Sequence, residues 1–295
     1  METINEFLPN FTSALKNNDL NKNNYNLSLI EESTKISNNP FLCLLLAYYL
    51  KNEINVILLS ERESLNHYAT IGRKFGINLT NMDNFCYVDF QSAFISMLNI
   101  ELPLSENFPN SFNILKAKNH IYLKKNDVFN QENFTFDYDK LILLLKEQIN
   151  KFKENKNKNI IIFDKTNDDI NQINKLIKFS CENNISLVYS VNKDWNEQST
   201  IDYLRYLSDI IIEFKQKESG FSKDVDGMMN IIINNDKLNG DITGDKASQI
   251  RYYLQSNNIK FFTHLKIWKS IFYNFIIILL YFRNIKKKIK FQKII

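Results

Sequence analysis

Glycine and proline are scarce in this chain, which has 6 glycines and 4 prolines among its 295 residues. A phosphate-binding loop needs glycines, because successive backbone N–H groups must point toward the phosphate. No glycine opens a helix after a predicted strand, so the sequence excludes a working Walker A loop. Because no Pro-, Gly- or Ser-rich linker divides the chain, we also expect one domain with additional ends. The six glycines are Gly72, Gly76, Gly220, Gly227, Gly240 and Gly244.

Cysteine and histidine are also few, with three of each. The cysteines lie inside apolar helix or strand patterns without paired spacing, which predicts buried thiols in a reduced, intracellular protein. No histidine has partners at the spacing of a metal site or a catalytic triad. We therefore predict no catalytic residue, no metal site and no bound cofactor. The residues concerned are Cys43, Cys86, Cys181, His67, His120 and His264.

A secretory leader is not expected, because the first residues, METINEFLPNF, have neither a basic region nor an apolar core. Acidic residues are missing from the last 33 residues, which hold eight Lys and Arg, although the whole chain has a net charge of only +4. Residues 1–262 therefore carry a net charge of −4. This charge does not indicate strong nucleic-acid binding by the domain as a whole.

The C-terminal tail, residues 263–295, contains an apolar run from Ile271 to Phe282. This run is shorter than the roughly 20 residues that a bilayer core requires, so we predict no membrane span and no membrane partner. The following basic segment, RNIKKKIK, leaves an interfacial membrane anchor as the alternative. We expect the tail to lie outside the fold.

The region from residue 41 to residue 90 has the clearest pattern of secondary structure. Apolar and branched residues predict strands at 54–60 and 85–90, and helical patterns at 41–51 and 67–76. Gly76 stands where a helix end favours positive φ. A strand, a helix and a strand joined by short links form a βαβ crossover, so the sequence predicts a parallel sheet with helices on both faces.

The segment NLSLI, residues 26–30, is predicted to be the first strand, and residues 31–40 the loop after it. A nucleotide-binding α/β protein would have its phosphate loop here. The segment has no glycine, Thr34-Lys35 reverses the Lys-Ser/Thr order, and Glu31 and Glu32 would repel phosphate. This loop is therefore not expected to bind a nucleotide.

The segment NIIIFD, residues 159–164, has the Walker B pattern of an apolar strand that ends in a carboxylate. Without a Walker A partner, we expect Asp164 to cap the following helix instead. The alternative is that Asp164 holds magnesium in an NTPase or a regulatory nucleotide-binding protein with an atypical phosphate site.

The remaining pattern changes along the chain from helices to hairpins. Residues 91–137 suggest a helix and a long connection, and residues 139–155 a strong helix. Strands are predicted at 185–190 and 209–214, with a helix at about 199–207 between them. The turn segment GFSKDVDG joins the second of these strands to MMNIII, and residues 250–262 form another hairpin. The C-terminal part of the sheet is therefore expected to be antiparallel.

These motifs resemble the Elongator complex protein 6 family from about Leu27 to Phe262. The family is similar to RecA in fold and lacks the ATP-binding signatures. The resemblance implies an α/β, RecA-like three-layer fold with a mostly parallel central sheet and C-terminal antiparallel hairpins, in a domain of residues 26–262 after a variable segment 1–25. The matching residues are His67, Tyr68, Gly72, Lys74, Gly76, Gly220, Phe221, Asp224 and Val225.

The resemblance implies that the protein is an accessory subunit without enzymatic activity of its own. It would form a hexameric ring with the paralogous Elongator subunits 4 and 5 and act beside the catalytic Elongator subunits. The assembled ring binds tRNA and supports modification of the wobble uridine, and older descriptions connect Elongator with transcription elongation. We expect the protein in the cytoplasm, with the nucleus as a second location.

We expect any contact with tRNA to come from loops at the C-terminal edge of the sheet, namely residues 165–169 and 192–198. Lys165 and Lys193 are the candidate phosphate contacts, and Trp195 can stack on a base. The alternative is that Trp195 packs against the protein and Lys193 is merely solvated.

Overall fold

The computed structural model describes residues 27–34, 37–90, 92, 117–123, 137–152, 158–164, 170–216, 226–233, 248–255 and 258–263. These residues form one sheet of ten strands in the order β10-β9-β8-β7-β1-β6-β5-β2-β3-β4. The strands are β1 (Leu27–Glu32), β2 (Asn55–Ser60), β3 (Phe85–Asp89), β4 (Asn119–Tyr122), β5 (Asn159–Asp164), β6 (Ser186–Asn192), β7 (Ile210–Lys215), β8 (Gly227–Ile233), β9 (Ser248–Gln255) and β10 (Asn258–Thr263).

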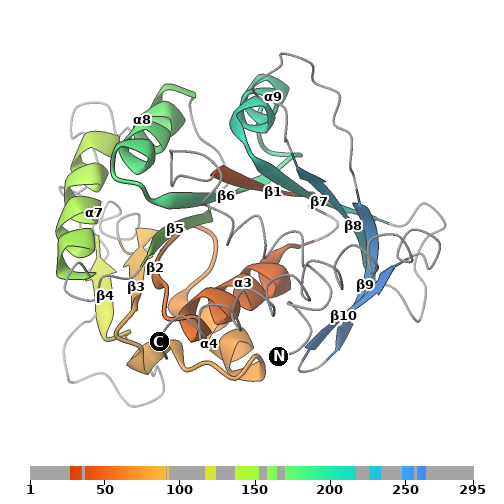
Figure 1. The fold of residues 1–295 in the computed structure, drawn as a ribbon, viewed down its shortest axis with the longest axis horizontal. Coiled ribbons are helices and arrows are strands. Elements are labelled where there is room, and N and C mark those ends of the chain that lie inside the picture. Colours follow the sequence, from red (N-terminus) through yellow and green to blue (C-terminus); the bar gives the residue numbers. More distant parts are fainter. Residues whose placement is uncertain are drawn as a thin grey trace, which may run out of the picture.

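Helices cover both faces of the sheet (Figure 1). The helices α3 (Asn39–Lys51) and α4 (Leu65–Lys74) lie on one face, and α7 (Tyr138–Phe152), α8 (Ile170–Glu182) and α9 (Gln198–Leu207) lie on the other. The connections explain this division. The chain moves in one direction along the sheet from β1 to β3 and in the opposite direction from β5 to β7, so right-handed crossovers place the two sets of helices on opposite faces. The mostly parallel three-layer fold is confirmed.

The central strands are short, rich in branched side chains and buried on both faces, as the continuous apolar runs predict. Strand β1 shows how the core divides. Leu27 and Leu29 face the layer of α7, α8 and α9, whereas Ile30 faces α3 and α4. Because side chains alternate along a strand, the next two residues, Glu31 and Glu32, also point to opposite faces.

The C-terminal strands β7, β8, β9 and β10 pair antiparallel, which confirms both predicted hairpins. Gly227 in β8 lies opposite Tyr252 in β9, and an added Cβ there would lie 2.5 Å from the tyrosine Oη. Glycine therefore leaves room for the Tyr252 ring to meet Phe214 edge-on, with 5.6 Å between the ring centroids. The turn residues Gly220, Phe221, Asp224 and Val225 lie outside the described residues.

Two sequence predictions about elements were wrong. Strand β1 continues to Glu32, so Glu31 and Glu32 are buried strand residues rather than loop residues. Strand β4 pairs parallel with β3 in a region for which we expected a helix and a connection. Its His120 ring stacks on Tyr122 and meets Tyr87 edge-on, so aromatic contacts help to hold this short strand against the sheet.

Local details of other elements agree with the sequence. Gly76 follows Phe75, the C-cap residue of α4, and has a φ of 71°, which confirms the predicted helix end. Gly72 lies inside α4 where an added Cβ would approach Ile77 to 3.1 Å. Cys43 and Cys86 are buried, but Cys181 near the end of α8 is exposed, so the prediction of three buried thiols was wrong for that residue. Burial raises the pKa of the Cys86 thiol to about 12.

Candidate functional site

The carboxyl ends of the parallel strands form the candidate site. In an open α/β sheet, ligands bind beyond these ends, where neighbouring connections leave in opposite directions. Such a point lies between β1, whose connection leads toward β2, and β6, whose connection leads toward β7. Charged or polar side chains stand at the ends of four strands here: Glu32, Ser60, Asp164 and Asn192.

Arg62 follows β2 and reaches across this edge. Its Nε donates to Asp164 Oδ1 at 2.7 Å, and its Nη2 donates to the same oxygen. Its Nη1 donates to Glu32 Oε1 on the far side. Nη2 also lies 3.2 Å from Asn38 Oδ1 and 3.4 Å from Ser190 Oγ. The Arg62 side chain is 11% exposed, and its single guanidinium forms ion pairs with both carboxylates.

Glu32 also binds the start of α3. Its Oε2 accepts a hydrogen bond of 2.8 Å from the backbone N–H of Asn38, the residue that precedes α3. A free helix N-terminus has unpaired N–H groups and a positive partial charge, which together favour a phosphate. In this chain a carboxylate of the protein itself takes that position.

Asp164 has a second set of contacts. Tyr68 from α4 donates its hydroxyl to Asp164 Oδ2 and is also bonded to Ser60 Oγ at 3.1 Å. Burial, and then the charge of Asp164, raise the pKa of Tyr68 well above its ordinary value. Both oxygens of Asp164 thus accept bonds from the α3 and α4 side of the sheet. Residues 165–169 lie outside the described residues, so the cap of the following helix by Asp164 stays a prediction.

We call these residues the Arg62 cluster: Glu32, Asn38, Arg62, Tyr68, Asp164 and Ser190. Its outer rim contains His67, whose Nδ1 lies 3.5 Å from Glu63 Oε2. Asn39 donates to the other oxygen of Glu63 at 3.1 Å. Of the residues that carried the family resemblance, Tyr68 and His67 thus belong to this edge, whereas Lys74 is exposed at the far end of α4.

A second charged group lies on the opposite face of β1, beneath α9. Arg205 donates from Nε to Glu31 Oε1 at 2.5 Å and from Nη2 to Glu31 Oε2 at 2.6 Å. Lys193 donates to Glu213 Oε1 at 2.6 Å and lies 3.3 Å from Glu31 Oε2. Lys215 lies 2.7 Å from Glu213 Oε2. We call this the Glu31 cluster, and its members are Glu31, Lys193, Arg205, Glu213, Lys215 and Asn230.

The cations of this cluster shift the pKa values of their partners. Burial alone would raise the pKa of Glu213, but hydrogen bonds from Lys193 and Lys215 outweigh that effect and lower it to about 2. The hydrogen bonds to Glu31 raise the pKa of Arg205 despite its partial burial. All three cations are partly exposed, and Arg205 is 36% exposed. The cations of the Glu31 cluster are thus more exposed to solvent than Arg62 is.

The predicted tRNA contacts have different surroundings. Trp195 lies between β6 and α9 and is 54% exposed, so its ring is available on the surface. Lys193 is in the Glu31 cluster, where its ammonium group already has two acidic partners. Lys165 lies outside the described residues.

The sequence reasoning missed Arg62 and Arg205, because neither belongs to a motif and only the fold brings their partners to them.

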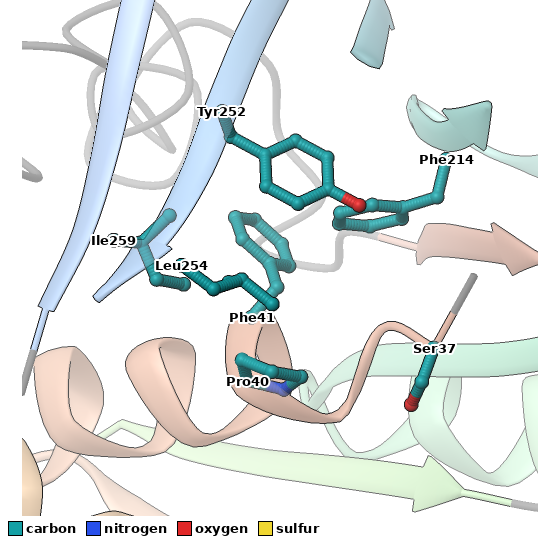
Figure 2. Close-up of a pocket in the computed structure, with 7 residues that line it drawn as sticks. All are labelled: Ser37, Pro40, Phe41, Phe214, Tyr252, Leu254 and Ile259. Carbon is teal, nitrogen blue, oxygen red and sulfur yellow. The ribbon is translucent and has the colours of Figure 1, made fainter. Parts of the chain in front are cut away.

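A small apolar pocket lies beside the start of α3 (Figure 2). Phe41, Phe214 and Tyr252 point toward one another in it, and Leu254 and Ile259 close one side. Its volume is about 10 Å³, which is room for a single water molecule. The pocket therefore has no space for a nucleotide base.

Within the described residues, no group of three or more His, Cys, Asp and Glu side chains could hold a metal ion. In the same part of the chain, no helix is long and apolar enough to cross a membrane. Of the C-terminal tail, the structure describes only Thr263, the last residue of β10. The predictions about residues 264–295 therefore concern residues that the structure does not describe.

Solved structures support the fold assignment. An uncharacterized protein from Pyrococcus horikoshii, crystallised with an unknown peptide, matches 90% of this chain and 98% of its own with a TM-score of 0.51. The two sequences are 11% identical, so the match shows a shared fold alone.

Sequence comparison identifies the family. Elongator complex protein 6 of Dictyostelium discoideum is 34% identical over 79 residues, which are 26% of this chain and 22% of that protein. The alignment thus spans about a fifth of the relative. The family model described as Elongation complex protein 6 matches residues 8–256, which is most of the chain and includes the whole of the Arg62 and Glu31 clusters. The chain belongs to the Elongation complex protein 6 family.

Proposed function

We propose that this protein is a non-catalytic subunit of Elongator that needs no nucleotide of its own. Family membership supports the place in Elongator. The observation that supports the absence of nucleotide chemistry is the Glu32 carboxylate at the start of α3, where it accepts the Asn38 N–H. A phosphate at this point would have to displace a buried carboxylate of the same charge.

The surroundings of Asp164 argue against the NTPase alternative. A magnesium ion would need a free oxygen of Asp164, but Arg62 and Tyr68 donate to both. Releasing Asp164 would break a buried ion pair with Arg62, and breaking such a pair costs about 3–5 kcal/mol. Nucleotide binding would therefore start from a large unfavourable rearrangement.

Binding of ATP tests this part of the proposal. We expect isothermal calorimetry on the purified full-length chain to give no heat of binding with magnesium and ATP at micromolar concentrations. A variant with Asp164→Asn is the control, because it removes the carboxylate at the end of the Walker-B-like strand. Micromolar binding by the unaltered chain that disappears in this variant would contradict the proposal.

The assembly that we propose is a hexameric ring with Elongator subunits 4 and 5, which joins the catalytic Elongator subunits and supports modification of the wobble uridine of tRNA. The family is the basis for this assembly. Purification of the tagged protein from its own cells, followed by mass spectrometry of the partners and native mass spectrometry of the complex, tests it. We expect two copies of the chain for two copies of each paralogue. A monomer without these partners would refute the assembly.

For tRNA we propose contacts through Trp195 and Lys193. Lys165, which lies outside the described residues, stays a candidate from the sequence. Trp195 is the strongest candidate, because its exposed ring can stack on any base. We expect Trp195→Ala to weaken tRNA binding by the assembled ring by about 1–3 kcal/mol. The matched control is Tyr206→Ala, which removes another exposed aromatic ring, on α9. Equal effects of the two substitutions, or none, would remove Trp195 from the proposal.

A further inference from the structure

The Arg62 guanidinium joins four segments of the chain. Glu32 ends β1, Asn38 precedes α3, Asp164 ends β5 and Ser190 lies in β6. Since β6 separates β1 from β5, the two strands that end in Glu32 and Asp164 run about 10 Å apart. A guanidinium group has donors on several sides of a rigid plane, so it can bind both carboxylates at once. A compact ammonium group has no such fork.

The two carboxylates depend on this cation because they are buried. The Glu32 side chain is 3% exposed and the Asp164 side chain is completely buried. Two buried negative charges at one strand edge are strongly unfavourable without a positive partner. Among the described residues, Arg62 is the one cation that forms an ion pair with either carboxylate.

We propose that Arg62 is an internal ligand of this fold. Its guanidinium occupies a cation site formed by Glu32 and Asp164, and Glu32 in turn occupies the phosphate position at the start of α3. In a nucleotide-binding protein, a metal ion and a phosphate would supply the positive and the negative charge at this edge of the sheet. Here Arg62 supplies the positive charge and Glu32 the negative charge. The site is selective for a planar, alkyl-substituted guanidinium. The proposal concerns contacts within one chain, so it is independent of the Elongator assembly.

Chemical rescue tests the proposal. We expect Arg62→Ala in the full-length chain to lower the Tm by roughly 10 °C, because it leaves two buried carboxylates without a cation. Ethylguanidinium at millimolar concentration should fill the vacated space and raise the Tm of this variant by about 2–4 °C. Ethylammonium at the same concentration should raise it by less than about 1 °C, because it has no fork.

The matched control is Arg73→Ala, which removes an exposed arginine of α4. Its Tm should change by less than about 2 °C and should not respond to ethylguanidinium. An Arg62→Ala variant as stable as this control, or one rescued equally by ethylammonium, would overturn the proposal.

A second variant covers the case in which Arg62→Ala does not fold. Adding Asp164→Asn removes one of the two buried charges, so the Arg62→Ala/Asp164→Asn chain should be more soluble and should unfold at a higher temperature than Arg62→Ala alone. It should also lose the preference for ethylguanidinium over ethylammonium. If the double variant is no better than the single one, the buried carboxylates are not the reason for the loss and the proposal is wrong.

Discussion

Two adjacent residues of β1, Glu31 and Glu32, end in two different charged clusters. Glu32 meets Arg62 on the face of α3 and α4, whereas Glu31 meets Arg205 on the face of α9. Both glutamates are buried, but Arg62 is 11% exposed and Arg205 is 36% exposed. The difference therefore lies in the cation. When its partner is lost, Arg205 can turn to water, but Arg62 cannot do so without rearrangement.

The two clusters also differ in what they connect. The Arg62 cluster binds the ends of β1, β5 and β6 to the start of α3 at the edge where a ligand would bind. The Glu31 cluster attaches α9 and the loop before it to β1, β7 and β8. The first replaces a ligand, whereas the second fastens α9 to the sheet through partly exposed cations. The following predictions can break or sharpen this comparison.

The largest difference should appear when each glutamate is removed in turn. We expect Glu32→Ala to lower the free energy of unfolding by about 3–5 kcal/mol, because it breaks a buried pair and leaves the Asn38 N–H without its acceptor. Glu31→Ala, the matched control one residue away, should cost about 1–3 kcal/mol, because Arg205 is partly solvated. Urea unfolding of both variants measures this. Equal losses would remove the distinction between the two clusters.

Acid should weaken the Glu31 cluster through Glu213, whose pKa in the folded protein is about 2 and whose ordinary value is 4.5. Because the pKa is lower in the folded protein, the unfolded chain binds the proton more tightly. The stabilisation is complete above about pH 4.5 and disappears as the pH falls toward 2, a change on the order of 2–3 kcal/mol.

Urea unfolding of the full-length chain and of Glu213→Gln between pH 6 and pH 3 measures this change. The variant cannot titrate at this position, so its stability should fall less steeply with acid, and the two chains should converge at low pH. If the difference between them is the same at every pH in this range, Glu213 does not have the depressed pKa.

A smaller effect should separate two tyrosine hydroxyls. Tyr68 donates to the buried Asp164, whereas Tyr203 on α9 donates to Asn174 at a partly exposed position. Tyr68→Phe should lower the free energy of unfolding by about 1–3 kcal/mol, because Asp164 loses a donor that water cannot replace. Tyr203→Phe should cost less than about 1 kcal/mol. If Tyr203→Phe lowers the free energy of unfolding as much as Tyr68→Phe does, the Arg62 cluster is not better shielded from solvent than the surroundings of Tyr203.

Much of the fold follows from local patterns in the sequence. The run INVILLS predicts β2 because branched apolar residues fit a strand buried on both faces, and Gly76 predicts the end of α4 because glycine adopts positive φ easily. Strand β4 could not be predicted in this way. It has four residues, and it is recognised only from its pairing with β3, which the contact of His120 with Tyr87 supports.

The candidate site was predictable only in part. The absence of glycine between Glu31 and Pro40 was enough to exclude a Walker A loop. It did not indicate what stands there instead. Glu31 and Glu32 looked like loop residues because buried glutamates are rare. They can lie in β1 because Arg62 neutralises Glu32, and Arg205 and Lys193 neutralise Glu31.

The sequence by itself determined most of the strands and helices and the lack of a phosphate loop, because each of these depends on residues within a few positions of one another. Tertiary structure alone decided the partners of the charges. Arg62 lies 102 residues from Asp164, and Arg205 lies 174 residues from Glu31. These pairs form because crossovers of the same hand bring the carboxyl ends of distant parallel strands to one edge, where a buried carboxylate is stable only with a cation beside it.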